Sequence, residues 1–157
     1  MKAFSVESTK NFMKELLVGE KFDDFLLEEA TIKTYNTFKI DGRILPEFYE
    51  DYEFGYEFSL WKNMKGICFD LIKGKQVPVG FHFVLQLAPE KVQQILRLGG
   101  STTPADMVKS FTLNIKYQNN EITLVTATAF NTFIMDKTPD ALWDNYIEQF
   151  LQSTANL

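Results

Sequence analysis

The sequence has few of the residues that build catalytic or metal centres. It contains one cysteine and one histidine in 157 residues, Cys68 and His82. A single thiol cannot close an internal disulfide, and a single imidazole cannot share a metal ion with a second histidine of the same chain. We therefore expect neither a disulfide scaffold nor a multi-histidine metal site, and we expect no cofactor.

Long hydrophobic runs are also missing. No segment approaches the roughly 18 uncharged apolar residues of a membrane-spanning helix. No charged and then apolar leader precedes the polar segment SVESTKN. The 16 Lys and Arg residues are outnumbered by 21 Asp and Glu residues, and this acidic balance argues against a broad nucleic-acid surface. We expect a cytoplasmic protein that does not insert into a membrane.

Aromatic residues, by contrast, make up 15% of the chain. The segment YEFGYEFSL, residues 52–60, places an aromatic or aliphatic side chain at every even position and Glu, Gly or Ser at every odd one. Such alternation is typical of a half-buried strand. Its four rings would present about 600 Å² of apolar surface, which a monomer seldom leaves exposed. We predict a core strand here, with a subunit interface as the alternative.

The remaining patterns predict an α+β fold, a mostly antiparallel sheet of about six strands with packed helices, in a single domain over residues 1–157. Asp41-Gly42 and Asn119-Asn120 favour hairpin turns, because both residue pairs tolerate positive φ. Apolar residues recur at helical spacing in four segments. These expected helices are 8–18, 59–73, 89–98 and 138–152.

The order of elements suggests that one plan is used twice. A strand, a helix and a hairpin are expected in residues 2–60 and again in residues 79–135. A helix over 60–73 links the two pseudo-repeats, and the C-terminal helix over 138–152 follows them. Residue identity between the two segments is low, so the repeat is one of pattern.

Two sets of residues are candidates for catalysis. Cys68 and His82 could form a nucleophile pair, but Cys68 shares the apolar stripe of its helix, where a thiol usually acts as a small hydrophobe. Acidic residues could serve as general acids or bases, but they alternate with aromatic residues as on the wet face of a strand. These acids are Glu47, Glu50, Asp51, Glu53 and Glu57.

Basic residues give two sets of binding candidates. One is a basic patch on the linking helix, with Asp70 as its only acid, for which a solubilising outer face is the alternative. It consists of Lys62, Lys65, Lys73 and Lys75. The other is a set of nucleic-acid contacts on the helices 8–18 and 89–98. It consists of Lys10, Lys14, Lys91 and Arg97. Duplex binding neutralises several phosphates, so we do not expect a monomer to bind nucleic acid.

Three segments resemble an uncharacterised bacterial family of unknown function, family 5721. They are MKAFSVESTKNFMKELL, LIKGKQVPVGFHFVLQLAPE and FNTFIMDKTPDALWDNYIEQFL, which together extend the resemblance over nearly the whole chain. The resemblance implies no activity, cofactor or site residue.

A weaker, topological resemblance is to the repeating unit of DNA sliding clamps, whose first strand and helix are similar in character to KAFSVESTKNFMKELL. Clamp rings contain six such units, so two units per chain would imply a trimer. The amphipathic helix near residue 150 is a departure from the clamp unit.

Two classes of function follow. The first is a non-catalytic binding or scaffold module, with clamp-like architecture and with a homo-oligomer or another protein as its partner. The second is a small enzyme that uses acidic residues, or Cys68 with His82, in a cleft. A deep pocket with converging carboxylates would favour the enzyme.

Overall fold

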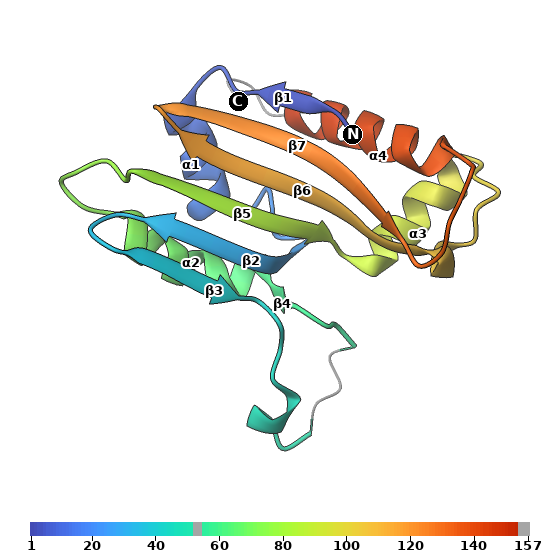
Figure 1. Ribbon diagram of the computed structural model, residues 1–157, viewed down its shortest axis with the longest axis horizontal. Helices are drawn as coiled ribbons and strands as arrows, with labels where there is room; N and C mark the ends of the chain where they lie inside the picture. The colour runs from blue at the N-terminus through green and yellow to red at the C-terminus, as the bar shows by residue number, and fades with distance from the viewer. Residues whose placement is uncertain (52–54, 154–157) are drawn as a thin grey trace.

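The computed structural model describes residues 1–51 and 55–153, and these form an α+β fold with one mostly antiparallel sheet (Figure 1). Six strands lie in the order β1-β7-β6-β5-β2-β3, and a short β4 also pairs with β2. All pairings are antiparallel. The strands are β1 (Ala3–Ser5), β2 (Phe25–Lys33), β3 (Thr37–Asp41), β4 (Ser59–Leu60), β5 (Gly80–Leu87), β6 (Val108–Gln118) and β7 (Glu121–Phe130).

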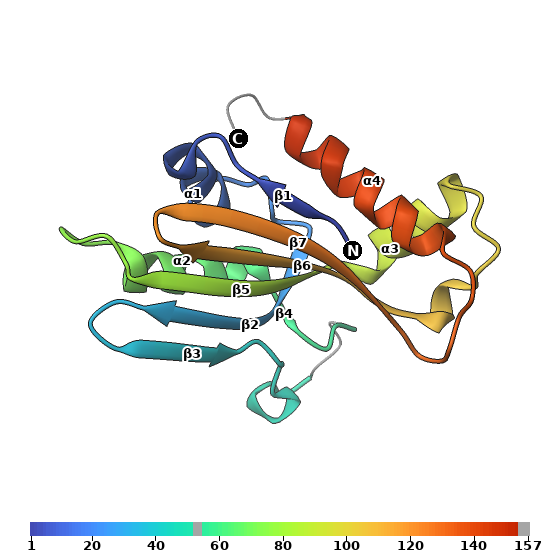
Figure 2. The same cartoon turned by 45° about the horizontal axis from the view of Figure 1, so that its top comes forward.

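Four α-helices cover one face of this sheet, as the turned view in Figure 2 shows. They are α1 (Thr9–Leu17), α2 (Trp61–Ile72), α3 (Pro89–Leu98) and α4 (Thr138–Gln152), with short 3-10 turns at Pro46–Phe48 and Ala105–Met107. Each helix contributes to one core cluster with the inward side chains of the strands. The buried rings include Phe12, Trp61, Phe83, Phe111 and Trp143. The expected α+β class is confirmed.

Local sequence signals fix several element ends. The Ser8 hydroxyl accepts a hydrogen bond from the Asn11 amide at 3.2 Å and so caps α1. Asn119 and Asn120 have φ of 54° and 64°, and they form the tight turn between β6 and β7 as predicted. Ser59 does not cap α2, whose N-cap is Leu60 without a side-chain hydrogen bond.

The predicted hairpin turn at Asp41-Gly42 is wrong. The chain reverses between Lys33 and Thr37 instead, and Asp41 pairs with Glu29 at the far end of β3. Gly42 serves a different purpose, because a Cβ at this position would lie 1.8 Å from the Leu27 carbonyl oxygen. The glycine therefore permits the backbone to cross close to β2.

In the described part of the segment 52–60, residues 55–60, only Ser59 and Leu60 lie in a strand, so this part does not form the long core strand that the alternation predicts. Residues 52–54, including the rings of Tyr52 and Phe54, lie outside the described residues. Gly55 and Tyr56 are not in a strand, and the Tyr56 hydroxyl donates to the Glu90 carboxylate at 2.5 Å. Phe58 is buried and forms only an isolated bridge with Arg43, before Ser59 begins β4. Residues 55–60 are thus divided between a loop and a short strand.

The order strand, helix and hairpin occurs in both halves, but the strand pairing differs between them. In the second half, the first strand is β5, and it lies directly beside β6, the first strand of the hairpin β6–β7. In the first half, β1 lies beside β7 and away from β2. A structural repeat of residues 2–60 and 79–135 is therefore not confirmed.

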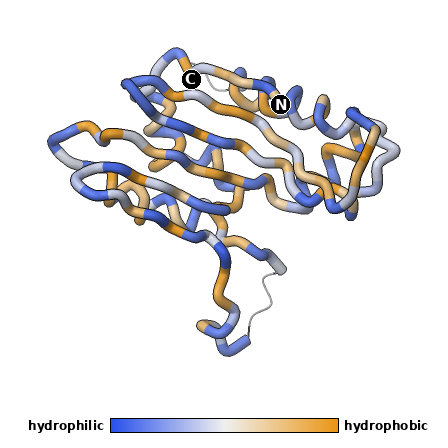
Figure 3. The backbone as a smooth tube through the Cα atoms, viewed as in Figure 1, coloured by the Kyte–Doolittle hydropathy of each residue, from blue (hydrophilic) through white to orange (hydrophobic). Residues whose placement is uncertain are grey.

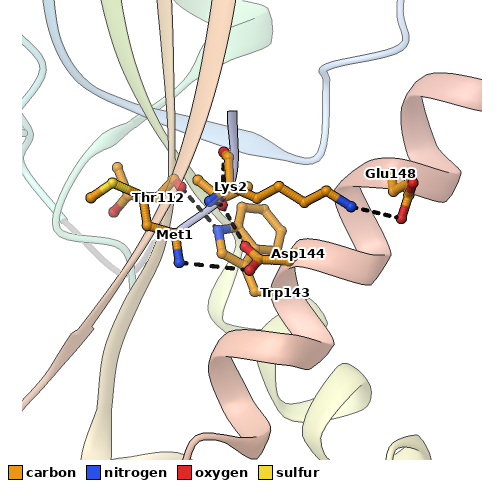
Figure 4. A network of polar contacts seen from close by, with 7 residues as sticks. Met1, Lys2, Thr112, Trp143, Asp144 and Glu148 are labelled. Carbon is orange, nitrogen blue, oxygen red and sulfur yellow. Dashed lines mark hydrogen bonds and ion pairs between the residues drawn. The ribbon is translucent and has the colours of Figure 1, made fainter. Parts of the chain in front are cut away.

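The N-terminal strand is fastened to α4 by a polar network (Figure 4). The Lys2 amide donates to Thr126 Oγ1 at 2.9 Å, and Lys2 Nζ lies 3.2 Å from Glu148 Oε2. The Met1 amino group lies 3.6 Å from the Asp144 carboxylate, and the Trp143 indole donates to the Thr112 carbonyl at 2.9 Å. The network holds α4 against the edge of the sheet that β1 and β7 form.

Candidate functional site

A groove of about 730 Å³ lies between α1, the end of α2 and the following loop at 73–78. The Trp61 indole donates to the Leu16 carbonyl at 2.9 Å and so joins the start of α2 to the end of α1. After α2 ends at Ile72, the loop that leads to β5 lines the groove together with residues of α1. Apolar side chains make the floor and wall of this groove: Met13, Leu17, Val18, Phe69, Ile72, Val77 and Pro78.

Four lysines rim this groove, which we call the basic groove. Lys10 and Lys14 come from α1, and Lys73 and Lys75 come from the end of α2 and the loop after it. The lining contains no acidic residue. Lys73 is 3.0 Å from Asp70 at an exposed position, whereas no described partner within 4 Å forms an ion pair with the other three. An acidic protein thus carries a local positive rim around an apolar floor.

The basic groove brings together two lysines from each of the two sets of basic candidates, a grouping that the sequence does not predict. Lys10 and Lys14 were expected to act with Lys91 and Arg97, but these two lie on α3, on the other side of the molecule from α1 (Figures 1 and 2). Lys91 lies 3.9 Å from Asp24, and Arg97 lines a separate hollow with Glu90.

Only half of the expected basic patch on the linking helix belongs to the basic groove. Lys62 is exposed and does not line the groove. Lys65 has a structural role, because its Nζ lies 2.7 Å from both Asp23 Oδ1 and the Gly19 carbonyl oxygen. Lys73 and Lys75 are the two members that reach the groove.

Cys68 and His82 lie on opposite faces of the sheet. Cys68 is fully buried in the core under the helices, and this burial raises the pKa of its thiol to about 12. His82 alternates with the buried Phe81 and Phe83 and points to the uncovered face, where its Nε2 is 3.2 Å from Asn114 Oδ1. The structure therefore does not bring this alternative nucleophile pair together, and a neutral buried thiol is a poor nucleophile.

The candidate acids do not converge in a pocket. Glu47, Glu50, Asp51 and Glu57 are exposed, and Glu53 lies outside the described residues. Glu57 forms an ion pair with Arg43. Glu47 lies in the short turn Pro46–Phe48, and Glu50 and Asp51 follow it, on an extension that projects from the body in Figure 1. Their arrangement is that of a solvated surface.

A second, smaller hollow lies on the uncovered face of the sheet. It measures about 330 Å³, and its lining includes Thr31, Lys33, Gly80, His82 and Lys116. Within residues 1–51 and 55–153, no three His, Cys, Asp or Glu side chains are close enough together to hold a metal ion. None of the described helices combines the length and the apolar content needed to span a membrane.

These features define an α+β protein with a sheet covered on one face and a lysine-rimmed apolar groove between two of its helices. A family model described as "Family of unknown function (DUF5721)" matches residues 15–156, and the chain belongs to this family. The expected family is thereby confirmed. Comparisons with curated proteins and with solved structures found no significant match, and the resemblance to clamp units is not confirmed.

Proposed function

We propose that this protein is a non-catalytic binding module whose basic groove receives an acidic, apolar segment of a protein. The observation that carries the proposal is the convergence of Lys10, Lys14, Lys73 and Lys75 around one apolar floor. A floor of this kind contributes affinity by burying apolar side chains of the partner. The lysines favour partners that carry carboxylates next to those apolar side chains.

The shape of the basic groove favours a polypeptide over a small molecule. Small-molecule sites generally bury most of the ligand surface in an enclosed cavity. Here the walls are the outer side of α1 and a surface loop, and Val77 at the rim is 71% exposed. An amphipathic segment that lies along a groove with one apolar side and one charged side matches this geometry.

The remaining chemistry of the chain agrees with a binding role. Cys68, His82 and the acids each have a structural explanation in the core, at the uncovered face or on the surface. The lone buried thiol also needs no oxidising compartment, and we place the module in the cytoplasm.

The test is titration of the full chain with a fluorescent amphipathic helical peptide of about 15 residues that presents Leu and Phe on one side and Glu on the other. The charge-reversed peptide, with Lys in place of Glu, is the ligand control. We expect Lys14→Gln with Lys73→Gln to weaken binding at least about tenfold. The matched control is Lys62→Gln with Lys116→Gln, two exposed lysines outside the groove, and it should bind normally. Equal affinity in both double variants would refute the proposal.

A further inference from the structure

The extension between β3 and β4 carries the side chains that the basic groove lacks. We call residues 44–51 the arm tip. Leu45 and Phe48 are exposed there by 61% and 82%, although both are large and apolar. Glu47, Glu50 and Asp51 are exposed beside them. Figure 3 shows hydrophobic and hydrophilic segments in close succession along this extension.

The arm tip has a defined shape. The turn Pro46–Phe48 is a 3-10 helix, and the Phe48 ring packs edge-on against the Tyr49 ring with centroids 5.4 Å apart. Two backbone hydrogen bonds close its base, from Ile44 to Glu57 at 2.9 Å and from Ser59 to Gly42 at 2.8 Å. The arm tip is therefore already ordered before it binds, so binding costs less conformational entropy.

The arm tip cannot reach the basic groove of its own chain. Gly80, at the start of β5 and just after the groove loop, pairs with Lys33, which in turn pairs with Thr37 at the start of β3. The arm leaves after Asp41, at the opposite end of β3, and it projects away from the loop at 73–78 in Figure 1. Tyr56, on the segment that returns from the arm to β4, also donates a hydrogen bond to Glu90 on α3.

We infer that the arm tip of one copy of this chain docks in the basic groove of a second copy. Leu45 and Phe48 lie against the apolar floor, and Glu47, Glu50 and Asp51 face the four lysines of the rim. The inference rests on the proposed function of the groove, and it identifies the occupant as a second copy. Both charge and apolar character are complementary, and both surfaces are present on every copy.

The contact is head-to-tail, because the two surfaces are different and lie apart on the molecule. Docking one arm leaves the first copy's groove and the second copy's arm open, so further copies can add until a ring closes or an open chain grows. A contact of one short turn in one groove is small, and we expect self-association to be weak and salt-dependent.

Sedimentation of the full chain at low salt tests this inference, at concentrations on the order of 100 μM, where weak contacts are populated. The arm variant, Phe48→Ser with Glu50→Gln, removes an apolar ring and a negative charge from the arm tip. The groove variant, Lys14→Gln with Lys73→Gln, removes two positive charges from the rim of the basic groove. We expect each double variant to self-associate at least about tenfold more weakly than the wild type. The control, Phe133→Ser with Glu121→Gln, removes an exposed ring and an exposed acid elsewhere and should behave as the wild type.

Mixing gives the sharper result. The groove variant retains an arm and the arm variant retains a groove, so the two together should form a 1:1 dimer that cannot grow, although each alone stays monomeric. A wild type that is monomeric under these conditions would overturn the inference. So would self-association that survives in the arm variant. If the helical probe binds in the groove while the chain stays monomeric, the proposed function stands and the second copy is excluded as occupant.

Discussion

The Thr126 hydroxyl donates a hydrogen bond of 2.5 Å to the Asp144 carboxylate, and this bond joins a fully buried position of β7 to α4. The same hydroxyl oxygen accepts from the Lys2 amide at 2.9 Å. Thr126 thus connects the N-terminal strand, the last strand and the last helix through one side chain. A buried polar group with such partners stabilises the fold only while all of them are present.

Thr126→Val should therefore lower the free energy of unfolding by about 1–3 kcal/mol, since valine keeps the shape but removes the hydrogen bonds that the hydroxyl makes with the Lys2 amide and the Asp144 carboxylate. The matched control is Thr123→Val, at an exposed position on the other face of the same strand. Urea unfolding of both variants measures the difference. Equal stabilities would show that water replaces the hydroxyl at no cost.

Gly42→Ala should be strongly destabilising, because the new Cβ would lie 1.8 Å from the Leu27 carbonyl oxygen and one of the two backbones must move. We expect a loss of about 2 kcal/mol or more in the free energy of unfolding. Gly74→Ala is the control, since nothing lies within 4 Å of its added Cβ. Thermal and urea unfolding compare the two, and comparable losses would contradict the assigned role of Gly42.

Cys68 should make stability fall at alkaline pH. The unfolded thiol ionises near pH 8.5, whereas burial raises the pKa of the folded thiol to about 12. Between these values the unfolded chain releases a proton that the folded chain keeps. Stability is then lost by at most roughly 1.4 kcal/mol per pH unit. Urea unfolding at pH 8 and pH 10 should show a larger loss in the wild type than in Cys68→Ala. Parallel losses would mean that the thiol ionises without unfolding.

Lys65 and Lys14 should separate stability from binding. Lys65→Met removes the contacts with Asp23 and the Gly19 carbonyl at a position where the side chain is only 17% exposed. We expect this variant to lose about 1–2 kcal/mol of stability and to bind the helical peptide normally. Lys14→Met should keep its stability and bind more weakly. The opposite assignment of effects would place the binding surface on the other side of α2.

His82→Ala should change neither property appreciably. The ring is half-buried at the uncovered face and contacts Asn114 across the β5–β6 pair. We expect a stability change below about 1 kcal/mol and unchanged peptide binding. Loss of binding with normal stability would instead direct attention to the small hollow beside Lys33 and Lys116.

Much of the fold could be predicted because its signals are local. The positive φ of Asn119 and Asn120 follows from residue type, and the cap at Ser8 follows from a hydroxyl before an apolar helical pattern. Asp41-Gly42 has the same kind of signal but another cause, since the absence of a side chain at Gly42 is required by Leu27, a residue distant in sequence. The alternation of 52–60 predicts a long strand for a similar reason, because it carries no sign of contacts with residues distant in sequence, such as the hydrogen bond from Tyr56 to Glu90.

The basic groove could not be predicted, because its lysines come from two segments that only the packing of α1 on α2 brings together. Lys10 and Lys14 recur at helical spacing and were grouped by an expected repeat, whereas Lys73 and Lys75 were grouped by their place on the linking helix. The hydrogen bond from Trp61 to the Leu16 carbonyl sets the relation between the two. No spacing in the sequence encodes that contact.

The pairing of β1 with β7 also constrains the order in which the chain folds during synthesis. Ala3 pairs with Val125, so β1 has no neighbouring strand in the sheet until β7 has been synthesised. The strands β2, β3 and β5 can pair well before that. β1 therefore stays unpaired while β2, β3, β5 and β6 are made, and deletion of β1 should leave the β2–β6 part of the sheet able to form while exposing the outer edge of β7.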